Sequence, residues 1–192
     1  MARAEEAARL APVHHTAPHR HHHQSDLARV ECVVITASDT RTPETDVSGR
    51  RAAELLEEAG HRVLERRIVR ETLDALQEAV GAALQRPAGL VLVTGGTGVG
   101  PRDRTPDALA AWIDTPLPGF GETFRRLSVE QVGPVGWTSR ALAGLHGEKL
   151  LVGLPGSPAA VQLGLRDVLL PVLPHLLGLA APRGHRSPKE TP

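Results

Sequence analysis

The feature that most restricts the fold of this chain is an alternation of apolar runs with helical periodicity between residues 30 and 94. Residues 30–36, 61–69 and 90–94 are predicted strands, because each contains a short run of Val, Ile or Leu bounded by polar or turn-forming residues. Residues 46–59 and 72–84 carry apolar side chains at three- and four-residue spacing, as amphipathic helices do. Strand, helix, strand, helix and strand in this order predict a parallel sheet with right-handed crossovers.

The remainder of the chain extends the same pattern. The further predictions are helices at about 105–113 and 121–127, a hairpin of strands 141–145 and 149–154, a helix beginning at Pro158, and an apolar segment 168–179 that packs on the sheet or on a neighbouring subunit. We therefore expect one α/β domain over residues 28–181, with three αβα layers and a mostly parallel central sheet. The second strand is polar enough to lie near a sheet edge.

Both ends differ in composition from this domain. Residues 1–27 contain six of the ten histidines without hydrophobic periodicity, which predicts a disordered His-rich tail, and residues 182–192 predict a flexible tail. The run His21-His22-His23 could bind a divalent metal weakly, or the whole tail could simply be solvated.

Composition excludes several classes of function. Lys plus Arg and Asp plus Glu number 22 each, so the chain has no net charge and no broad basic field for nucleic acid. Aromatic residues make up 2%, which disfavours base stacking. The single Cys32 excludes a disulfide framework and is expected to be buried. Without a long apolar run or a secretory signal, we expect a cytoplasmic protein with no membrane span.

The most informative segment is TGGTGVGPRDRTPD, residues 94–107, which follows a predicted central strand. Open α/β sheets bind ligands at the carboxyl ends of their strands, and glycines let backbone N–H groups approach an anion closely. A phosphate there would meet these donors, the Thr97 hydroxyl and Arg102, and Asp103 could hold a Mg²⁺ shared with the phosphate. The alternative is a plain glycine-rich turn in which Asp103 is only a loop residue.

The same segment also predicts a helix start, with Thr105 as N-cap and Pro106 at the first helical position. It is not a P-loop, because no Gly-Lys-Ser/Thr follows the glycines.

Two other strand-to-helix junctions are expected at the same sheet edge. The first strand ends in Ser38-Asp39-Thr40 and leads to a helix start at Ser48-Gly49, and a later strand ends at Gly156-Ser157. Any one of them could be ordinary turn chemistry, but three together favour a binding site over a plain scaffold.

These motifs occur in an order that resembles the MoaB/Mog family of molybdenum cofactor biosynthesis proteins, over about residues 29–180. The motifs are Ser38-Asp39, Asp46-Val47-Ser48-Gly49, TGGTG at 94–98, PRDRTPD at 101–107, PGFGE at 118–122, Ser139-Arg140-Ala141 with Ala143-Gly144, and LPGSP at 154–158. The resemblance implies a molybdopterin-binding fold, a homotrimer and possible work beside the molybdate-insertion protein. It also implies transfer of AMP from Mg-ATP to the terminal phosphate of molybdopterin.

The family's functional residues carry over onto matching positions here. Asp103 would be the catalytic acidic residue and a Mg²⁺ ligand. The substrate-binding residues implied are Ser38, Asp39, Ser48, Gly95, Gly96, Thr97, Gly98, Ser139, Arg140, Gly156 and Ser157. Transfer to a phosphate nucleophile needs no strong base, so positioning and charge neutralisation would carry it.

One position departs from the family pattern. Active relatives carry a second acidic residue after the second strand, where this chain has Arg70 followed by Glu71. Arginine cannot ligate Mg²⁺ but can hold a phosphate, and Glu71 could substitute if the loop shifts by one residue. Two hypotheses remain: a molybdopterin adenylyltransferase, or a molybdopterin-binding protein of the same fold with little or no transfer activity, on the MoaB rather than the Mog branch. A domain related to competence-damage or molybdate-insertion proteins is disfavoured by the PGFGE and Ser-Arg-Ala segments.

Overall fold

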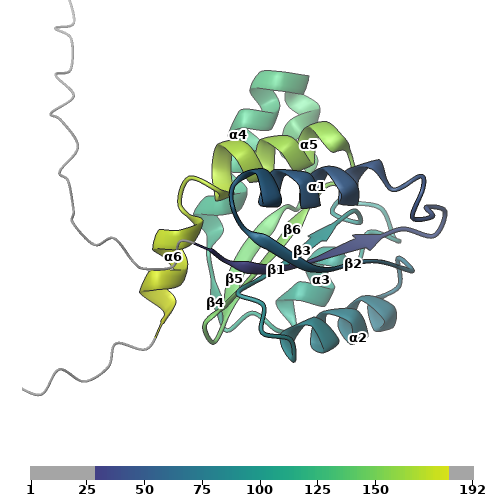
Figure 1. Cartoon of the computed structure of the whole chain (residues 1–192). Coiled ribbons are helices and arrows are strands. Elements are labelled where there is room, and N and C mark those ends of the chain that lie inside the picture. The colour runs from purple at the N-terminus through teal and green to yellow at the C-terminus, as the bar shows by residue number, and fades with distance from the viewer. Residues whose placement is uncertain (1–28, 182–192) are drawn as a thin grey trace, which may run out of the picture.

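The computed structural model describes residues 29–181. The tails predicted at residues 1–27 and 182–192 lie outside the described residues, so those two predictions are not tested. Within the described range the chain forms a six-stranded sheet with helices on both sides, which confirms the predicted three-layer αβα class (Figure 1).

The sheet has the order β2-β1-β3-β6-β5-β4. The strands are β1 Glu31–Ala37, β2 Arg62–Val69, β3 Leu90–Thr94, β4 Thr115–Pro116, β5 Leu142–His146 and β6 Lys149–Leu154. Strands β2, β1, β3 and β6 are mutually parallel, whereas β5 is antiparallel to both β6 and β4. The predicted edge position of the second strand and the hairpin through His146 are therefore confirmed.

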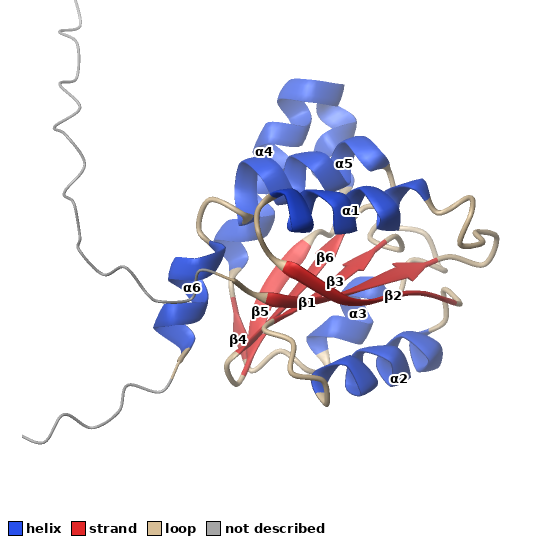
Figure 2. Cartoon of the chain, in the orientation of Figure 1, coloured by secondary structure: helices blue, strands red, loops and turns tan. Residues whose placement is uncertain are grey.

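Each face of the sheet is covered by its own layer of helices (Figure 2). One layer contains α1 Val47–Glu58, α4 Pro118–Val132, α5 Pro158–Gln162 and α6 Leu173–Ala180, and the opposite layer contains α2 Leu73–Leu84 and α3 Thr105–Ala110. Along β3, Leu90 and Leu92 pack on the first layer while Val91 and Val93 pack on the second. A strand buried on both faces is continuously apolar, which explains the run seen in the sequence.

Side chains cap the first two helices. The Asp46 carboxylate accepts the N–H of Gly49 at 2.9 Å at the start of α1, and the Thr72 hydroxyl accepts that of Ala75 at 3.4 Å at the start of α2. Asp46 is buried, and the Thr36 hydroxyl donates to its second oxygen at 2.9 Å. The end of β1 and the start of α1 are thus tied together.

Two helical boundaries differ from the prediction. Helix α3 ends at Ala110 because the N–H groups of Trp112 and Ile113 both turn back to the Leu109 carbonyl. Helix α4 is longer than residues 121–127, since Pro118 starts it and Gly133, at φ 76°, ends it. The predicted apolar segment 168–179 packs into the core through Leu169, Leu173 and Leu177, and Pro171 separates a π-helical stretch, Leu163–Leu169, from α6.

Over residues 29–181, no single helix has the length and apolar composition needed to cross a membrane. The bent pair Pro158–Leu169 and Leu173–Ala180 meets those two criteria only when taken together.

Candidate functional site

The glycine loop, residues 95–100, begins where β3 ends, at the carboxyl edge of the parallel strands. Gly95 and Gly96 have φ values of 98° and 61°, in the left-handed region that favours glycine. A Cβ on Gly95 would lie 2.5 Å from the Ala37 carbonyl oxygen, at the end of β1. The two glycines thus let the loop turn sharply while it touches the neighbouring strand.

The predicted β6 turn lies directly against this loop. A Cβ on Gly156 would lie 3.2 Å from the Cα atom of Gly95, and the Thr94 hydroxyl donates to the Pro155 carbonyl at 2.9 Å. The Ser48 hydroxyl, at the start of α1, donates to the Gly156 carbonyl at 2.7 Å. The structure therefore brings the three predicted strand-to-helix junctions to one place.

The prediction that Thr105 caps α3 is wrong. Thr105 is the first residue of the helix, so Pro106 is the second, and the buried Thr105 hydroxyl donates to the Gly95 carbonyl at 2.7 Å. The hydroxyl was expected to cap its own helix because capping is a local interaction, but a carbonyl ten residues earlier lies closer.

Thr97 is the member of the loop with an unused polar group. Its side chain is 3% exposed, and its hydroxyl makes no hydrogen bond to any residue between 29 and 181. Solvent still reaches this oxygen, because among residues 29–181 the fully buried side-chain polar atom without a partner is Trp112 Nε1 and not the Thr97 hydroxyl. The hydroxyl is therefore available to a ligand atom in the glycine loop.

Three carboxylates from three different loops lie around the glycines. The Asp103 carboxylate accepts the N–H of Gly100 at 2.8 Å, and Asp39 accepts the N–H of Glu71 at 3.2 Å. The Glu71 carboxylate lies over Gly96, where a Cβ would be 2.9 Å from its Oε1 atom. Burial raises the pKa of Glu71, and the negative charges of Asp103 and Asp39 raise it further, while Arg102 opposes them.

This arrangement bears on Mg²⁺ binding. Among residues 29–181, no three Asp, Glu, His or Cys side chains are close enough together to hold a metal ion by themselves. Mg²⁺ needs no such cage, because proteins usually bind it through one or two carboxylates together with substrate phosphates and water. Asp103, whose Oδ1 atom accepts no hydrogen bond in the described chain, fits that mode, and Glu71 brings a second carboxylate to the same loop.

Arg70 lies just after β2 and is exposed. Its guanidinium makes no hydrogen bond or ion pair with residues 29–181, so it is not used to hold the fold together. Glu71, and not Arg70, is the residue of this loop that approaches the glycines.

Three of the predicted serines have local hydrogen bonds. The Ser38 hydroxyl accepts the N–H groups of Thr40 and Arg41, and the Ser139 hydroxyl accepts that of Ala141. The Ser157 hydroxyl accepts the N–H of Ala160 and caps α5. These serines shape the turns around the glycine loop.

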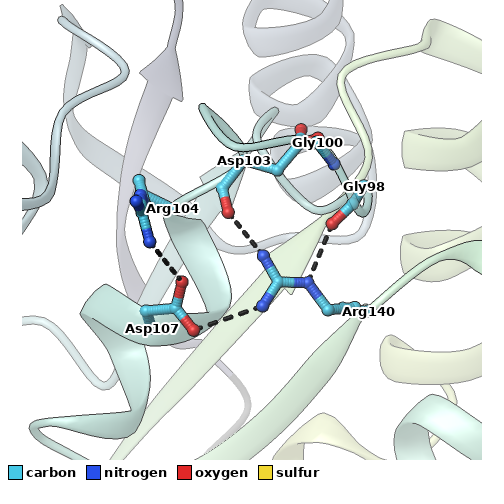
Figure 3. A network of polar contacts seen from close by, with 6 residues as sticks. All are labelled: Gly98, Gly100, Asp103, Arg104, Asp107 and Arg140. Atoms are coloured by element: carbon cyan, nitrogen blue, oxygen red, sulfur yellow. Dashed lines mark hydrogen bonds and ion pairs between the residues drawn. The ribbon is translucent and has the colours of Figure 1, made fainter.

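Arg140 is joined to the glycine loop by both its main chain and its side chain. Its N–H donates to the Thr97 carbonyl at 2.8 Å, and its Nε atom donates to the Gly98 carbonyl at 2.8 Å. Figure 3 shows its guanidinium between Gly98, Asp103 and Asp107. Sequence reasoning selected Arg140 as a ligand residue but missed these contacts.

Cavities mark two places near these elements. One of about 530 Å³ lies between α1, α4 and α5 and contains none of the predicted site residues. A smaller one of about 220 Å³ is lined by Ser139, Pro155 and Ser157 together with apolar side chains of α4. The smaller cavity contains two of the predicted site residues, Ser139 and Ser157, but no residue of the glycine loop lines it.

The fold and site together define an α/β protein with a glycine-rich ligand loop at the carboxyl edge of a mostly parallel sheet. A family model described as "Probable molybdopterin binding domain" matches residues 33–175. Molybdenum cofactor biosynthesis protein B of Bacillus cereus is 41% identical over 157 residues, covering 81% of this chain and 93% of that protein.

Two solved structures agree. A crystal structure of a molybdenum cofactor biosynthesis protein B has a TM-score of 0.77 at 41% identity, covering 79% of this chain and 96% of that one. The tungsten cofactor synthesizing protein MoaB from Pyrococcus furiosus has a TM-score of 0.71 at 32% identity, covering 79% and 97%. The chain therefore belongs to the MoaB/Mog family of molybdenum cofactor biosynthesis proteins, as its motifs indicated.

Proposed function

We propose that this protein binds molybdopterin at the glycine loop and transfers AMP from Mg-ATP to its terminal phosphate. The observation that carries the binding claim is the hydroxyl of Thr97, which has no partner within residues 29–181, beside the backbone N–H groups of residues 96–98, which donate to no residue in that range. Such a loop suits a phosphate, since its donors are fixed before the ligand arrives.

The transfer step has a simple balance. An oxygen of the terminal phosphate of molybdopterin forms a bond to the α-phosphorus of ATP, and the bond from that phosphorus to the bridging oxygen breaks, releasing pyrophosphate. The protein's part is to align the two phosphates and to stabilise charge on the leaving group. Backbone N–H groups of residues 96–98 would hold the pterin phosphate, since that of Gly95 already donates to the Leu154 carbonyl, and Arg102 and Arg70 would lie beside the polyphosphate.

Asp103 would hold Mg²⁺, with Glu71 as the second carboxylate. The ion, when bound, would neutralise phosphate charge. Glu71 takes the place of the family's usual acidic residue because its carboxylate, unlike the side chain of Arg70, reaches the loop.

The second candidate is a molybdopterin-binding protein with little or no transfer activity. Arg70 favours it, because a cation at the usual acidic position repels Mg²⁺. Both candidates predict the same pterin affinity, and they separate on consumption of ATP in the presence of the pterin.

Binding is tested by equilibrium titration of the full chain with molybdopterin under anaerobic conditions. Replacing Thr97 by Val keeps the shape but removes the hydroxyl, and we expect affinity to fall about tenfold, as for loss of one hydrogen bond to a charged group. Thr115→Val is the matched control, since Thr115 is exposed on β4 and its side chain makes no hydrogen bond within residues 29–181. Equal affinity in the parent and Thr97→Val would show that the hydroxyl does not contact the ligand. Absence of molybdopterin binding by the parent would overturn the proposal.

A homotrimer, work beside a molybdate-insertion protein and a cytoplasmic location are further parts of the proposal. Sedimentation equilibrium of the full chain tests the trimer. Addition of molybdate or tungstate to the adenylylated molybdopterin formed with Mg-ATP tests which of the two oxyanions it accepts, a question raised by the tungsten relative.

A further inference from the structure

Arg140 makes three side-chain contacts that end on three different parts of the site. Its Nε atom donates to the Gly98 carbonyl at 2.8 Å, and one Nη donates to the Asp103 carbonyl. The other Nη contacts the carboxylate of Asp107, in the first turn of α3, at 3.2 Å. The loop before Asp103 and the helix after it are thus bound by one planar group (Figure 3).

The bonds from Arg140 to the Gly98 and Asp103 carbonyls matter because few other hydrogen bonds hold residues 98–103 in place. Between Gly98 and Asp103 the described hydrogen bonds are the pair between Gly100 and Asp103, in which each N–H donates to an oxygen of the other residue. A Cβ on Gly98 would lie 2.7 Å from Oδ2 of Asp103, so the carboxylate direction depends on where this stretch of loop lies. The guanidinium contacts the loop from outside this small ring.

Arg104 provides the contrast. It also reaches Asp107, at 3.7 Å, but it contacts no carbonyl of the glycine loop. Two arginines therefore approach the same carboxylate, and only Arg140 links it to the loop.

We propose that Arg140 is a positioning residue, which sets the conformation of the glycine loop and the direction of the Asp103 carboxylate, and does not itself contact the ligand. Three of its five guanidinium N–H donors already have protein acceptors, so the loop and α3 orient the group before any ligand arrives. Arginine suits the task because its donors are held in a rigid fork, and a lysine ammonium cannot reach three divergent acceptors in the same way. The inference rests on the proposed function, because the loop being positioned is the proposed ligand loop.

The test begins on the free protein, by amide hydrogen exchange measured residue by residue with NMR. In Arg140→Ala we expect exchange at Gly100 and Asp103 to rise on the order of tenfold, as for loss of a charged hydrogen-bond partner. Exchange at the amides of β3 should stay within about twofold of the parent, because the hydrogen bonds between β3 and its neighbouring strands do not involve Arg140. Arg140→Lys should give an intermediate rise, and the matched control Arg104→Ala should leave the loop amides unchanged.

Molybdopterin affinity of the same variants completes the test. Positioning predicts that affinity falls in the order parent, Arg140→Lys, Arg140→Ala, in parallel with the rise in loop exchange. Lost affinity with unchanged loop exchange would make Arg140 a direct ligand residue and overturn the inference. If exchange in β3 became faster to the same extent, Arg140 would stabilise the whole fold and not the loop in particular, which would also overturn the inference. If the parent binds no molybdopterin, the proposed function fails, while the exchange data still decide whether Arg140 sets the loop.

Discussion

Ser48 and Gly156 are 108 positions apart in the chain and are joined by a 2.7 Å hydrogen bond from the serine hydroxyl to the glycine carbonyl. The bond ties the start of α1 to the turn after β6, and that turn touches Gly95. The Ser48 hydroxyl therefore holds the start of α1 against the turn that contacts the glycine loop.

Replacing Ser48 by Ala should lower the free energy of unfolding by about 1–2 kcal/mol, because the Gly156 carbonyl is left without its partner in a partly buried place. Chemical denaturation of parent and variant measures this. Ser157→Ala would be a poor comparison because that serine caps α5, whereas Thr115→Val changes an exposed hydroxyl and should leave stability within about 0.5 kcal/mol. An unchanged midpoint in Ser48→Ala would show that the bond contributes nothing.

Gly96 should not tolerate a side chain. Its φ of 61° disfavours any L residue, and a Cβ would lie 2.8 Å from the Thr105 hydroxyl and 2.9 Å from Glu71 Oε1. We expect Gly96→Ala to cost about 1–2 kcal/mol of stability from the backbone alone.

The matched control for Gly96 is Gly119→Ala. Gly119 is exposed in the first turn of α4, and its added Cβ would meet nothing within 4 Å, so this change should be neutral or stabilise by up to about 1 kcal/mol. Equal effects of the two substitutions, measured by thermal unfolding, would contradict the strain assigned to Gly96.

His61 should make stability depend on pH in mildly acidic solution. The buried ring accepts the N–H of Val30 through Nδ1 at 3.3 Å, and burial lowers the pKa of His61 below 6.5. The unfolded chain then binds more protons than the folded one, so His61's contribution to stability is full above pH 6.5 and declines as the pH falls from 6.5 toward the lowered pKa.

The measurement is the free energy of unfolding between pH 5 and 8 for the parent and His61→Asn, which keeps a polar side chain able to accept a hydrogen bond but does not titrate. The variant should be less stable at pH 8 and should have a shallower slope below pH 6.5. Parallel curves for the two proteins would remove His61 as the cause.

Cys32 should be unreactive in the folded protein. Its side chain is fully buried in β1, and burial, followed by the charge of Glu31, raises the pKa of the thiol to about 12. Compared with an ordinary pKa of 9.0, the thiolate at pH 8 is about a thousandfold scarcer. Iodoacetamide should label Cys32 only after denaturation, and rapid labelling of native protein would show that β1 opens.

The fold was predictable where the chemistry is local. The apolar runs of β1 and β3, the apolar spacing of α1 and α2, and the polar edge strand β2 are each visible within a few residues. The meeting of the loops after β1, β3 and β6 followed from one rule, that the carboxyl ends of parallel strands lie at one edge, whereas Ser139 and Arg140 precede the antiparallel strand β5 and were selected from the resemblance alone.

What could not be predicted is how side chains cross between loops. Arg140 finds its acceptors 42, 37 and 33 positions earlier in the chain, and no periodicity encodes that pairing. Thr105 was assigned to its own helix for the same reason, because the sequence does not show that the Gly95 carbonyl lies nearer. The approach of Glu71 to Gly96 likewise depends on the register between β1 and β2.

The central claim is tested most directly by the formation of adenylylated molybdopterin when the purified full chain is incubated with molybdopterin and Mg-ATP. We predict that the parent forms product although it carries Arg70, so the substitution Arg70→Asp is not needed for activity. Asp103→Ala and Glu71→Gln should form little or none. A parent that binds the pterin but forms no product, together with an Arg70→Asp variant that does, would contradict the claim and make this chain a binding protein of the same fold.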